Sequence, residues 1–97
     1  MKIEFTKNGG IMNVTLEGRL DTTTAPQLED VLSKNLMGVD ELILDCTNLV
    51  YVSSAGLRVL LATQKKAKDS MKLINVCEFV MEVFEMTGFA DILTIEN

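Results

Sequence analysis

Hydrophobic and polar residues alternate in two stretches at the start of the chain. Apolar side chains occupy every second position over residues 2–6 and again over residues 12–17. A period of two is typical of a strand with one buried face. The turn sequence Asn8-Gly9-Gly10 lies between the two stretches. The pattern therefore predicts that the chain opens with an antiparallel hairpin.

The spacing of apolar residues then changes to that of helices. A first helix is predicted after Thr24-Ala25-Pro26-Gln27, which has the form of a capping box with proline in the first turn, and Gly38 ends it. Its inward positions are Leu28, Val31, Leu32 and Leu36. Further helices are predicted over residues 54–68 and, before Gly88, over residues 78–87.

Short apolar runs separate these helices. Leu42-Ile43-Leu44 is flanked by charge, which predicts a central strand covered on both faces. Residues 73–76 predict another buried strand, and residues 92–95 a short last element. Strands that alternate with helices pair mostly in parallel. The predicted fold class is therefore α/β: a single domain over residues 1–97 with a mixed β-sheet, in which an N-terminal hairpin is followed by alternating helices and mostly parallel strands.

The charge of the chain is concentrated at one end. The 97 residues carry a formal net charge of −5, and residues 78–97 contain five acidic residues and no basic one. Nucleic-acid binding needs many cations to neutralise phosphates, so no direct nucleic-acid partner is expected. No apolar run approaches the roughly 18 residues of a membrane span, and the N-terminus has no apolar signal stretch. These features predict a cytoplasmic protein that does not bind membranes.

Few residues are available for catalysis. The sequence contains no histidine, so neither a Ser-His-Asp nor a Cys-His arrangement can be built from it. Cys46 and Cys77 lack metal-ligand spacing and are interpreted as small buried hydrophobes in a reducing compartment. We therefore expect neither an enzyme nor a metal site.

Two serines fall where a loop is predicted to turn into a helix. One interpretation is that Ser53 or Ser54 caps this helix and that Gly56 allows close packing. The other is that a hydroxyl beside Ala55 and Gly56 is accessible to phosphorylation. A phosphate there would face the free N–H groups at the start of the helix. The sequence pattern alone leaves both interpretations open.

The segment around these serines resembles a known family. This segment reads VSSAGLRVLL, preceded by LILDCTNLVYV, and it resembles the signature of STAS domains, in particular those of bacterial anti-sigma factor antagonists. Two further stretches resemble the same family. They are GRLDTTTAPQLEDVL, which is similar to the stretch before the family's first helix, and NVCEFVMEVFEMTGFADIL, which is similar to the region of its last helix. The resemblance covers nearly the whole chain and implies a STAS-like fold.

The resemblance also implies a modification site. The family motif is commonly Asp-Ser-Ser/Thr-Gly-Leu, in which the serine after the aspartate is phosphorylated. Alignment on Gly56 and Leu57 places that serine at Ser54, the aspartate at Ser53 and the second Ser/Thr at Ala55. Ser54 is therefore the predicted phosphorylation site, with Ser53 as second choice. The implied partner-binding residues are Asp21, Thr22, Thr23, Ser53, Ser54, Ala55, Gly56, Leu57 and Arg58.

The function implied by the resemblance is a phosphorylation-controlled binding module. The unphosphorylated form would bind an anti-sigma factor that is also a serine kinase and so release the sigma factor. The kinase would bring its own ATP and Mg²⁺, so the chain itself needs no cofactor, and a serine phosphatase would reset the switch. The alternative is a non-phosphorylated STAS adaptor subunit of a transport or signalling assembly.

Several charged residues have two interpretations each. Asp21 and Asp45 follow apolar runs, so both are expected at strand ends. One interpretation is that they are turn residues. The other is that both lie at one edge of the sheet, close to the Ser54 loop. The spacing of Glu78, Glu82 and Glu85 indicates a solvated helix face. Near the end of the second predicted helix lie Lys65, Lys66 and Lys68. Their positive charges either stabilise the negative end of the helix dipole or form a local basic patch.

Overall fold

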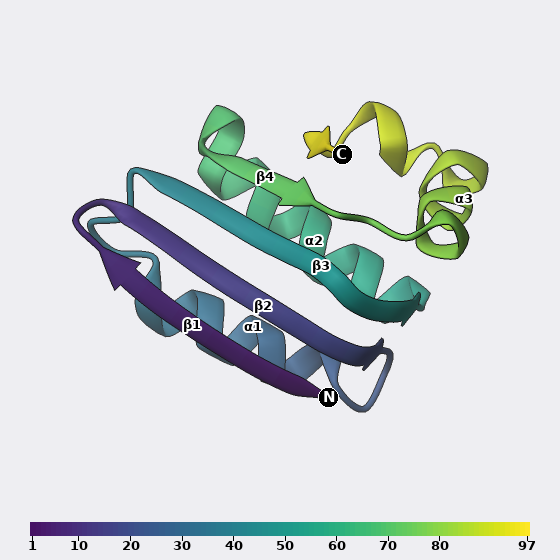
Figure 1. The fold of residues 1–97 in the computed structure, drawn as a ribbon, viewed down its shortest axis with the longest axis horizontal. Coiled ribbons are helices and arrows are strands. Elements are labelled where there is room, and N and C mark those ends of the chain that lie inside the picture. The colour runs from purple at the N-terminus through teal and green to yellow at the C-terminus, as the bar shows by residue number, and fades with distance from the viewer.

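The computed structural model describes residues 1–97, apart from the side chain of Lys68. Figure 1 shows one twisted sheet with two helices behind it and a third helix beside one end. In chain order the elements are β1 (Lys2–Asn8), β2 (Ile11–Leu20), α1 (Ala25–Asn35), β3 (Glu41–Val52), α2 (Ser54–Ala67), a 3₁₀ turn (Lys68–Ser70), β4 (Met71–Ile74), α3 (Glu78–Thr87), a second 3₁₀ turn (Phe89–Asp91) and β5 (Ile95–Glu96).

The sheet has five strands in the order β1-β2-β3-β4-β5. β1 and β2 are antiparallel, and each later neighbour is parallel to the strand before it. The predicted α/β class, the opening hairpin and the mostly parallel sheet are therefore confirmed. No helix in the described part of the chain is long and apolar enough to span a membrane.

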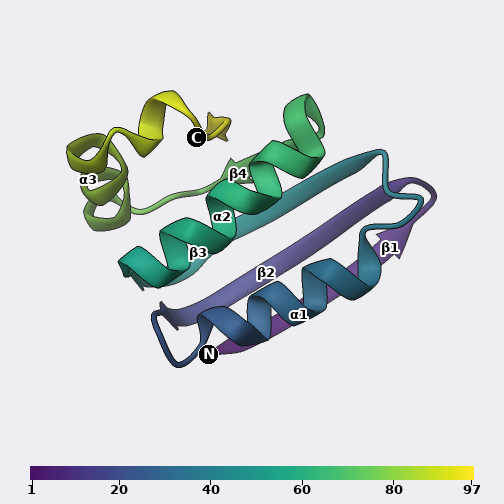
Figure 2. The same cartoon turned by 180° about the vertical axis from the view of Figure 1, so that it is seen from behind.

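The helices α1 and α2 cover the same face of the sheet (Figures 1 and 2). Leu28 and Leu32 of α1 and Leu57 and Leu60 of α2 are buried against the sheet residues of that face. Since these long apolar side chains leave water together, they supply most of the driving force for packing the two layers. In the part of the chain that the structure describes, no such layer of helices covers the opposite face of the sheet (Figures 1 and 2).

The expectation that Leu42-Ile43-Leu44 is covered on both faces is therefore wrong. Leu42 and Leu44 are 1% and 0% exposed, whereas Ile43 points to the other face and is only partly buried. The reason is that both helices that follow β2 and β3 cross the sheet on one side. A run of three apolar residues cannot by itself distinguish this two-layer arrangement from three layers.

Two β-bulges lengthen β3. This strand has 12 residues where its partner β2 has 10. The extra residues fall between Asp45 and Asn48 and between Leu49 and Tyr51. The inward side chains of β3 are Leu42, Leu44, Cys46, Leu49 and Val52. The spacing of these side chains changes from two to three at each bulge, so the strand continues where the alternating pattern stops. The prediction of a short strand that ends at Asp45 is therefore wrong.

Most of the remaining boundaries differ little from the prediction, but the last strand is β5 over Ile95–Glu96 rather than an element over residues 92–95. β4 lies over Met71–Ile74 rather than residues 73–76, because Asn75 adopts a left-handed conformation with φ 58° and ends the strand. α3 has the predicted bounds and ends at Gly88, whose φ of 82° suits the residue after a helix. Lys65 and Lys66 lie in the last turn of α2, and the side chain of Lys68 is outside the described residues.

Candidate functional site

The start of α2 is joined directly to the end of β2. Ser53 N donates to Leu20 O at 2.9 Å. A Cβ atom on Gly56 would lie 2.7 Å from Leu20 Cγ and 2.8 Å from Leu20 O, closer than atoms pack. The interpretation of Gly56 as a close-packing residue is confirmed. This contact places the Ser54 segment beside the residues that follow β2.

Ser53 and Ser54 have different surroundings. The Oγ atom of Ser53 is buried and finds no hydrogen-bond partner among the described residues, so this hydroxyl does not cap α2. Ser54 is the first residue of α2 and is exposed to solvent. Of the two candidates, Ser54 is therefore the exposed residue, and Ser53 is the one whose hydroxyl is buried.

Asp21 organises the turn between β2 and α1. Its Oδ1 atom accepts hydrogen bonds from Thr23 N at 3.0 Å and Thr24 N at 3.1 Å. The bond from the Thr24 backbone is the main reason why the pKa of Asp21 lies below its ordinary value. Asp21 is thus the predicted turn residue, and it lies at the same edge of the sheet as Ser54 because β2 and β3 are neighbours.

The predicted capping box at Thr24 is wrong. The Thr24 side chain makes no capping bond to α1. Instead its hydroxyl donates to Arg19 O at 2.7 Å and accepts from Asp21 N at 2.8 Å. The hydroxyl therefore closes the turn before the helix and is no longer available to the N–H groups of the first helical turn.

A row of three side chains, Arg19, Tyr51 and Phe79, continues from Asp21 across the surface. Arg19 Nε lies 3.9 Å from Asp21 Oδ2, and the guanidinium carbon of Arg19 lies 4.0 Å from the centroid of the Tyr51 ring. The Tyr51 and Phe79 rings stack with centroids 6.4 Å apart. We call these three residues the Arg19 row. The sequence did not predict this row because its members come from β2, β3 and α3. The one hint in the sequence was the aromatic Phe79 at the start of α3.

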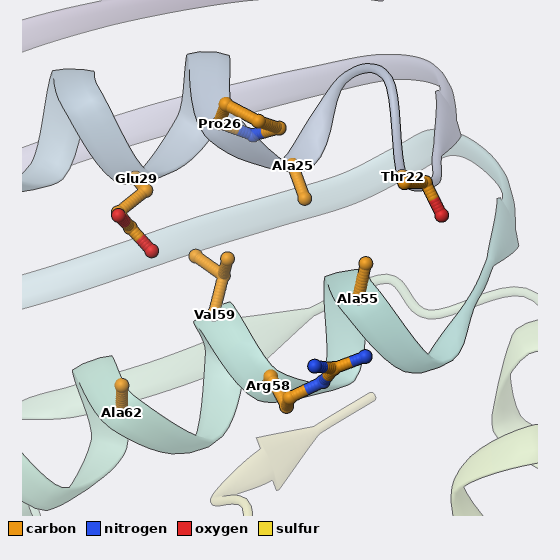
Figure 3. A pocket seen from close by; sticks show the side chains of 8 residues that line it. All are labelled: Thr22, Ala25, Pro26, Glu29, Ala55, Arg58, Val59 and Ala62. Carbon is orange, nitrogen blue, oxygen red and sulfur yellow. The ribbon is translucent and has the colours of Figure 1, made fainter.

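A groove of about 400 Å³ runs between α1 and α2. Figure 3 shows that both helices contribute side chains to it and that the Arg58 guanidinium lies back along α2 toward the start of the helix. Its lining residues are Thr22, Ala25, Pro26, Glu29, Ala55, Arg58, Val59 and Ala62. Thr22, Ala55 and Arg58 belong to the predicted partner-binding residues, so the groove adjoins that surface.

Asp45 lies away from this site. β3 continues for seven residues beyond Asp45, to Val52, which corresponds to roughly 20 Å of strand. The Asp45 carboxylate accepts from Thr47 Oγ1 at 2.6 Å, from Thr47 N at 3.0 Å and from Asn75 Nδ2 at 3.3 Å, and the Thr47 hydroxyl contributes most to its lowered pKa. The expectation that Asp45 ends a strand near Ser54 is wrong; it stabilises the first bulge of β3.

The two cysteines are unpaired. Cys46 is buried, and this burial raises the pKa of its thiol to about 12, so the thiolate does not form at neutral pH. Cys77 is only partly buried, and its thiol lies 3.4 Å from Leu49 O. Among the described residues, no three His, Cys, Asp or Glu side chains are grouped so that they could hold a metal ion.

The fold and the serine-bearing helix start together match one family. The family model of the STAS domain matches residues 2–97, and the chain belongs to this family. BtrV of Bordetella bronchiseptica, which carries a provisional name as an anti-sigma factor antagonist, is 36% identical over 100% of this chain and 87% of its own length. The anti-sigma-B factor antagonist of Staphylococcus aureus is 28% identical over 100% of this chain and 94% of its own length.

Solved structures show the same fold. The anti-sigma factor antagonist SpoIIAA in its unphosphorylated form superposes with a TM-score of 0.75 at 16% identity, over 99% of this chain and 88% of that one. Its phosphorylated form, from Bacillus, gives 0.74 at 17% identity, over 99% of this chain and 92% of that one. At such identities the likeness concerns the fold alone.

Proposed function

We propose that this protein is an anti-sigma factor antagonist, whose unphosphorylated form binds an anti-sigma factor with serine kinase activity and thereby releases the sigma factor. The observation that carries the proposal is the exposed Ser54 at the start of α2, fixed beside the Asp21 turn by the contact between Gly56 and Leu20. The names of the curated relatives support the same class of function.

The binding surface in this proposal is formed by two segments that are far apart in the chain. Asp21, Thr22 and Thr23 follow β2, and residues 53–58 comprise Ser53 and the first residues of α2. The Arg19 row extends this surface on the other side of Asp21. Arginine and aromatic residues often dominate binding energy at protein interfaces. The proposed partner therefore contacts the end of the sheet, the start of α2 and the Arg19 row together.

The bound kinase inactivates the module by phosphorylating Ser54. In this step the Ser54 Oγ atom bonds to the γ-phosphorus of the kinase's Mg²⁺-ATP, the bond from that phosphorus to the β,γ-bridging oxygen breaks, and ADP leaves. The hydroxyl proton passes to a base on the kinase. Ser53 is a poorer acceptor because its Oγ atom is buried. The chain contributes the acceptor, and the partner contributes ATP, Mg²⁺ and the catalytic residues.

The phosphate ends the complex through local charge and bulk. A phosphoserine carries about −1.5 to −2 charges at neutral pH. Since Ser54 lies on a helix packed tightly against β2, the phosphate changes the surface without requiring a change of fold. A serine phosphatase resets the switch by hydrolysing the phosphate ester, with water supplying the new phosphate oxygen. The proposed cycle takes place in the cytoplasm.

The test compares binding and phosphorylation for three single variants. The cognate anti-sigma kinase is incubated with wild type, Ser54→Ala, Ser54→Asp and Ser53→Ala, and phosphopeptides are mapped. We expect Ser54→Ala to bind without being phosphorylated and Ser54→Asp to bind at least tenfold more weakly. The matched control Ser53→Ala, which loses only a buried Oγ atom, should be phosphorylated at Ser54 as wild type is. Phosphate on Ser54→Ala would disprove the site. Kinase binding by Ser54→Asp as tight as by wild type would disprove the charge switch, and no kinase binding at all would favour the adaptor alternative.

A further inference from the structure

Arg58 lies one helical turn after Ser54 and reaches back toward it. Arg58 Nε donates to Ser54 O at 3.4 Å, a long hydrogen bond. Figure 3 shows the guanidinium lying along α2 on the side of the helix start. Residues four apart on a helix share one face, so the Ser54 and Arg58 side chains are neighbours. Any group attached to Ser54 Oγ is therefore within reach of the Arg58 side chain.

The Arg58 guanidinium is not paired with a carboxylate of the described residues. Glu29 lines the same groove from α1 but forms no ion pair with Arg58. The other arginine, Arg19, is held between Asp21 and the Tyr51 ring. A guanidinium carries five N–H donors in a planar fork that fits phosphate and carboxylate oxygens. Arg58 thus offers unused donors on the proposed binding surface.

We infer that Arg58 becomes the internal counterion of the phosphate on Ser54. This inference rests on the proposed phosphorylation of Ser54. In the unphosphorylated protein the Arg58 fork is free to bind an acidic group on the anti-sigma kinase. In the phosphorylated protein the same fork binds the chain's own phosphate, and the kinase loses this contact. Phosphorylation therefore acts twice, because it adds a negative charge and withdraws a positive donor from the interface.

The test measures the phosphate itself and does not need a kinase. Phosphoserine is placed at position 54 by genetic encoding in wild type, Arg58→Gln, Arg58→Lys and Lys65→Gln. Lys65 is a matched control because it is exposed and lies near the other end of the same helix. Phosphorus NMR then follows the second ionisation of the phosphate, whose pKa is ordinarily about 6. A guanidinium beside the phosphate favours the dianion and lowers this pKa.

We expect the phosphate pKa to be about half a unit higher in Arg58→Gln than in wild type, at low salt. Arg58→Lys keeps the charge and lies between the two, and Lys65→Gln equals wild type. Molar salt screens an exposed pair, so it narrows the difference between wild type and Arg58→Gln. The N–H groups at the helix start are present in all four proteins, so their effect on the phosphate cancels in the comparison.

Equal phosphate pKa values in wild type and Arg58→Gln would overturn the inference and leave the proposed function standing. An equal rise in Arg58→Gln and Lys65→Gln would also overturn it, because the effect would then reflect total charge. Conversely, if the kinase leaves Ser54 unmodified, the proposed function fails whatever the NMR result. The two failures are therefore distinguishable.

Discussion

The two ends of strands β2 and β3 are built differently. At the end that carries Ser54, which we call the switch end, Gly56 is packed against the backbone oxygen and the buried side chain of Leu20. At the opposite end, Gly10 O accepts hydrogen bonds from Asp40 N at 2.7 Å and Glu41 N at 3.1 Å. A Cβ on Gly10 would there meet the exposed Asp40 carboxylate.

The two ends differ in whether the group next to the glycine can move aside. A flexible, exposed side chain can turn away from an added methyl group, whereas a backbone oxygen and a core leucine cannot without separating β2 from α2. The proposed phosphorylation site thus lies at the end that can adjust less. A rigid position suits the proposed switch, which acts by local charge, because the partner and the phosphate then meet the same geometry.

The largest expected effect is that of Gly56→Ala. The new methyl group would overlap Leu20, so we expect the free energy of unfolding to fall by about 2–3 kcal/mol, even though alanine is the better helix former by about 1 kcal/mol. Gly10→Ala, the matched change at the opposite end, should cost less than about 1 kcal/mol. Urea denaturation of both variants checks the pair, and equal losses would contradict the contrast between the two ends.

A smaller effect is expected from the stacked rings at the switch end. Tyr51 and Phe79 stack although Phe79 is 52% exposed. A double-mutant cycle with Tyr51→Leu and Phe79→Leu should give a coupling free energy of about 0.5–1 kcal/mol. Chemical denaturation of the four proteins measures it. Strict additivity of the two substitutions would show that the rings do not connect β3 to α3.

Acid should weaken the switch end through Asp21, with an effect below that of the stacked rings. The backbone N–H of Thr24 is the main group that holds the pKa of Asp21 below its ordinary value. The carboxylate therefore stabilises the fold fully above its unfolded pKa of about 3.9, and this contribution is lost as the pH falls through the lower folded value. Thermal unfolding between about pH 5 and pH 2 should show a shallower loss for Asp21→Asn than for wild type. Parallel curves would contradict this role.

The smallest effect is expected at the opposite end, from Lys72. Its Nζ atom lies 3.4 Å from Glu41 Oε1 and 3.4 Å from Glu96 Oε1, and both carboxylates are substantially exposed. Exposed ion pairs contribute little, so Lys72→Met should change the unfolding free energy by less than about 1 kcal/mol, and by less still in molar salt. A loss comparable to that of Gly56→Ala, measured by urea denaturation, would contradict our view that this end is loosely held.

Much of the fold was predictable because its signals are local. The Asn8-Gly9-Gly10 turn predicted the hairpin, and the helical spacing before Gly88 predicted α3 with its observed bounds. The length of β3 was not predictable in this way. Its two bulges change the apolar spacing from two to three, which no longer indicates a strand, and they are visible only once β2 lies alongside.

The candidate site likewise has parts that local sequence signals predict and parts that they do not. The Ser54 segment was found because its motif is contiguous, and the Asp21 turn because it follows a strand. The pairing of Thr24 with Arg19 O and the Arg19 row depend on contacts across β2, β3 and α3. Such contacts follow from the tertiary arrangement, and a list of charges and spacings does not contain them.

The two bulges of β3 have a consequence for insertions and deletions. Each bulge adds one residue to β3 without changing which side of the sheet the following residues face, so Val52 faces inward as Leu42 does. Loss of one residue at a bulge would therefore remove that bulge, keep Val52 inward and shorten only the path to α2. Loss of one residue between Glu41 and Leu44, where the pairing with β2 is regular, would instead turn part of the strand to the wrong face. Variation in the length of this strand is therefore expected at the two bulges.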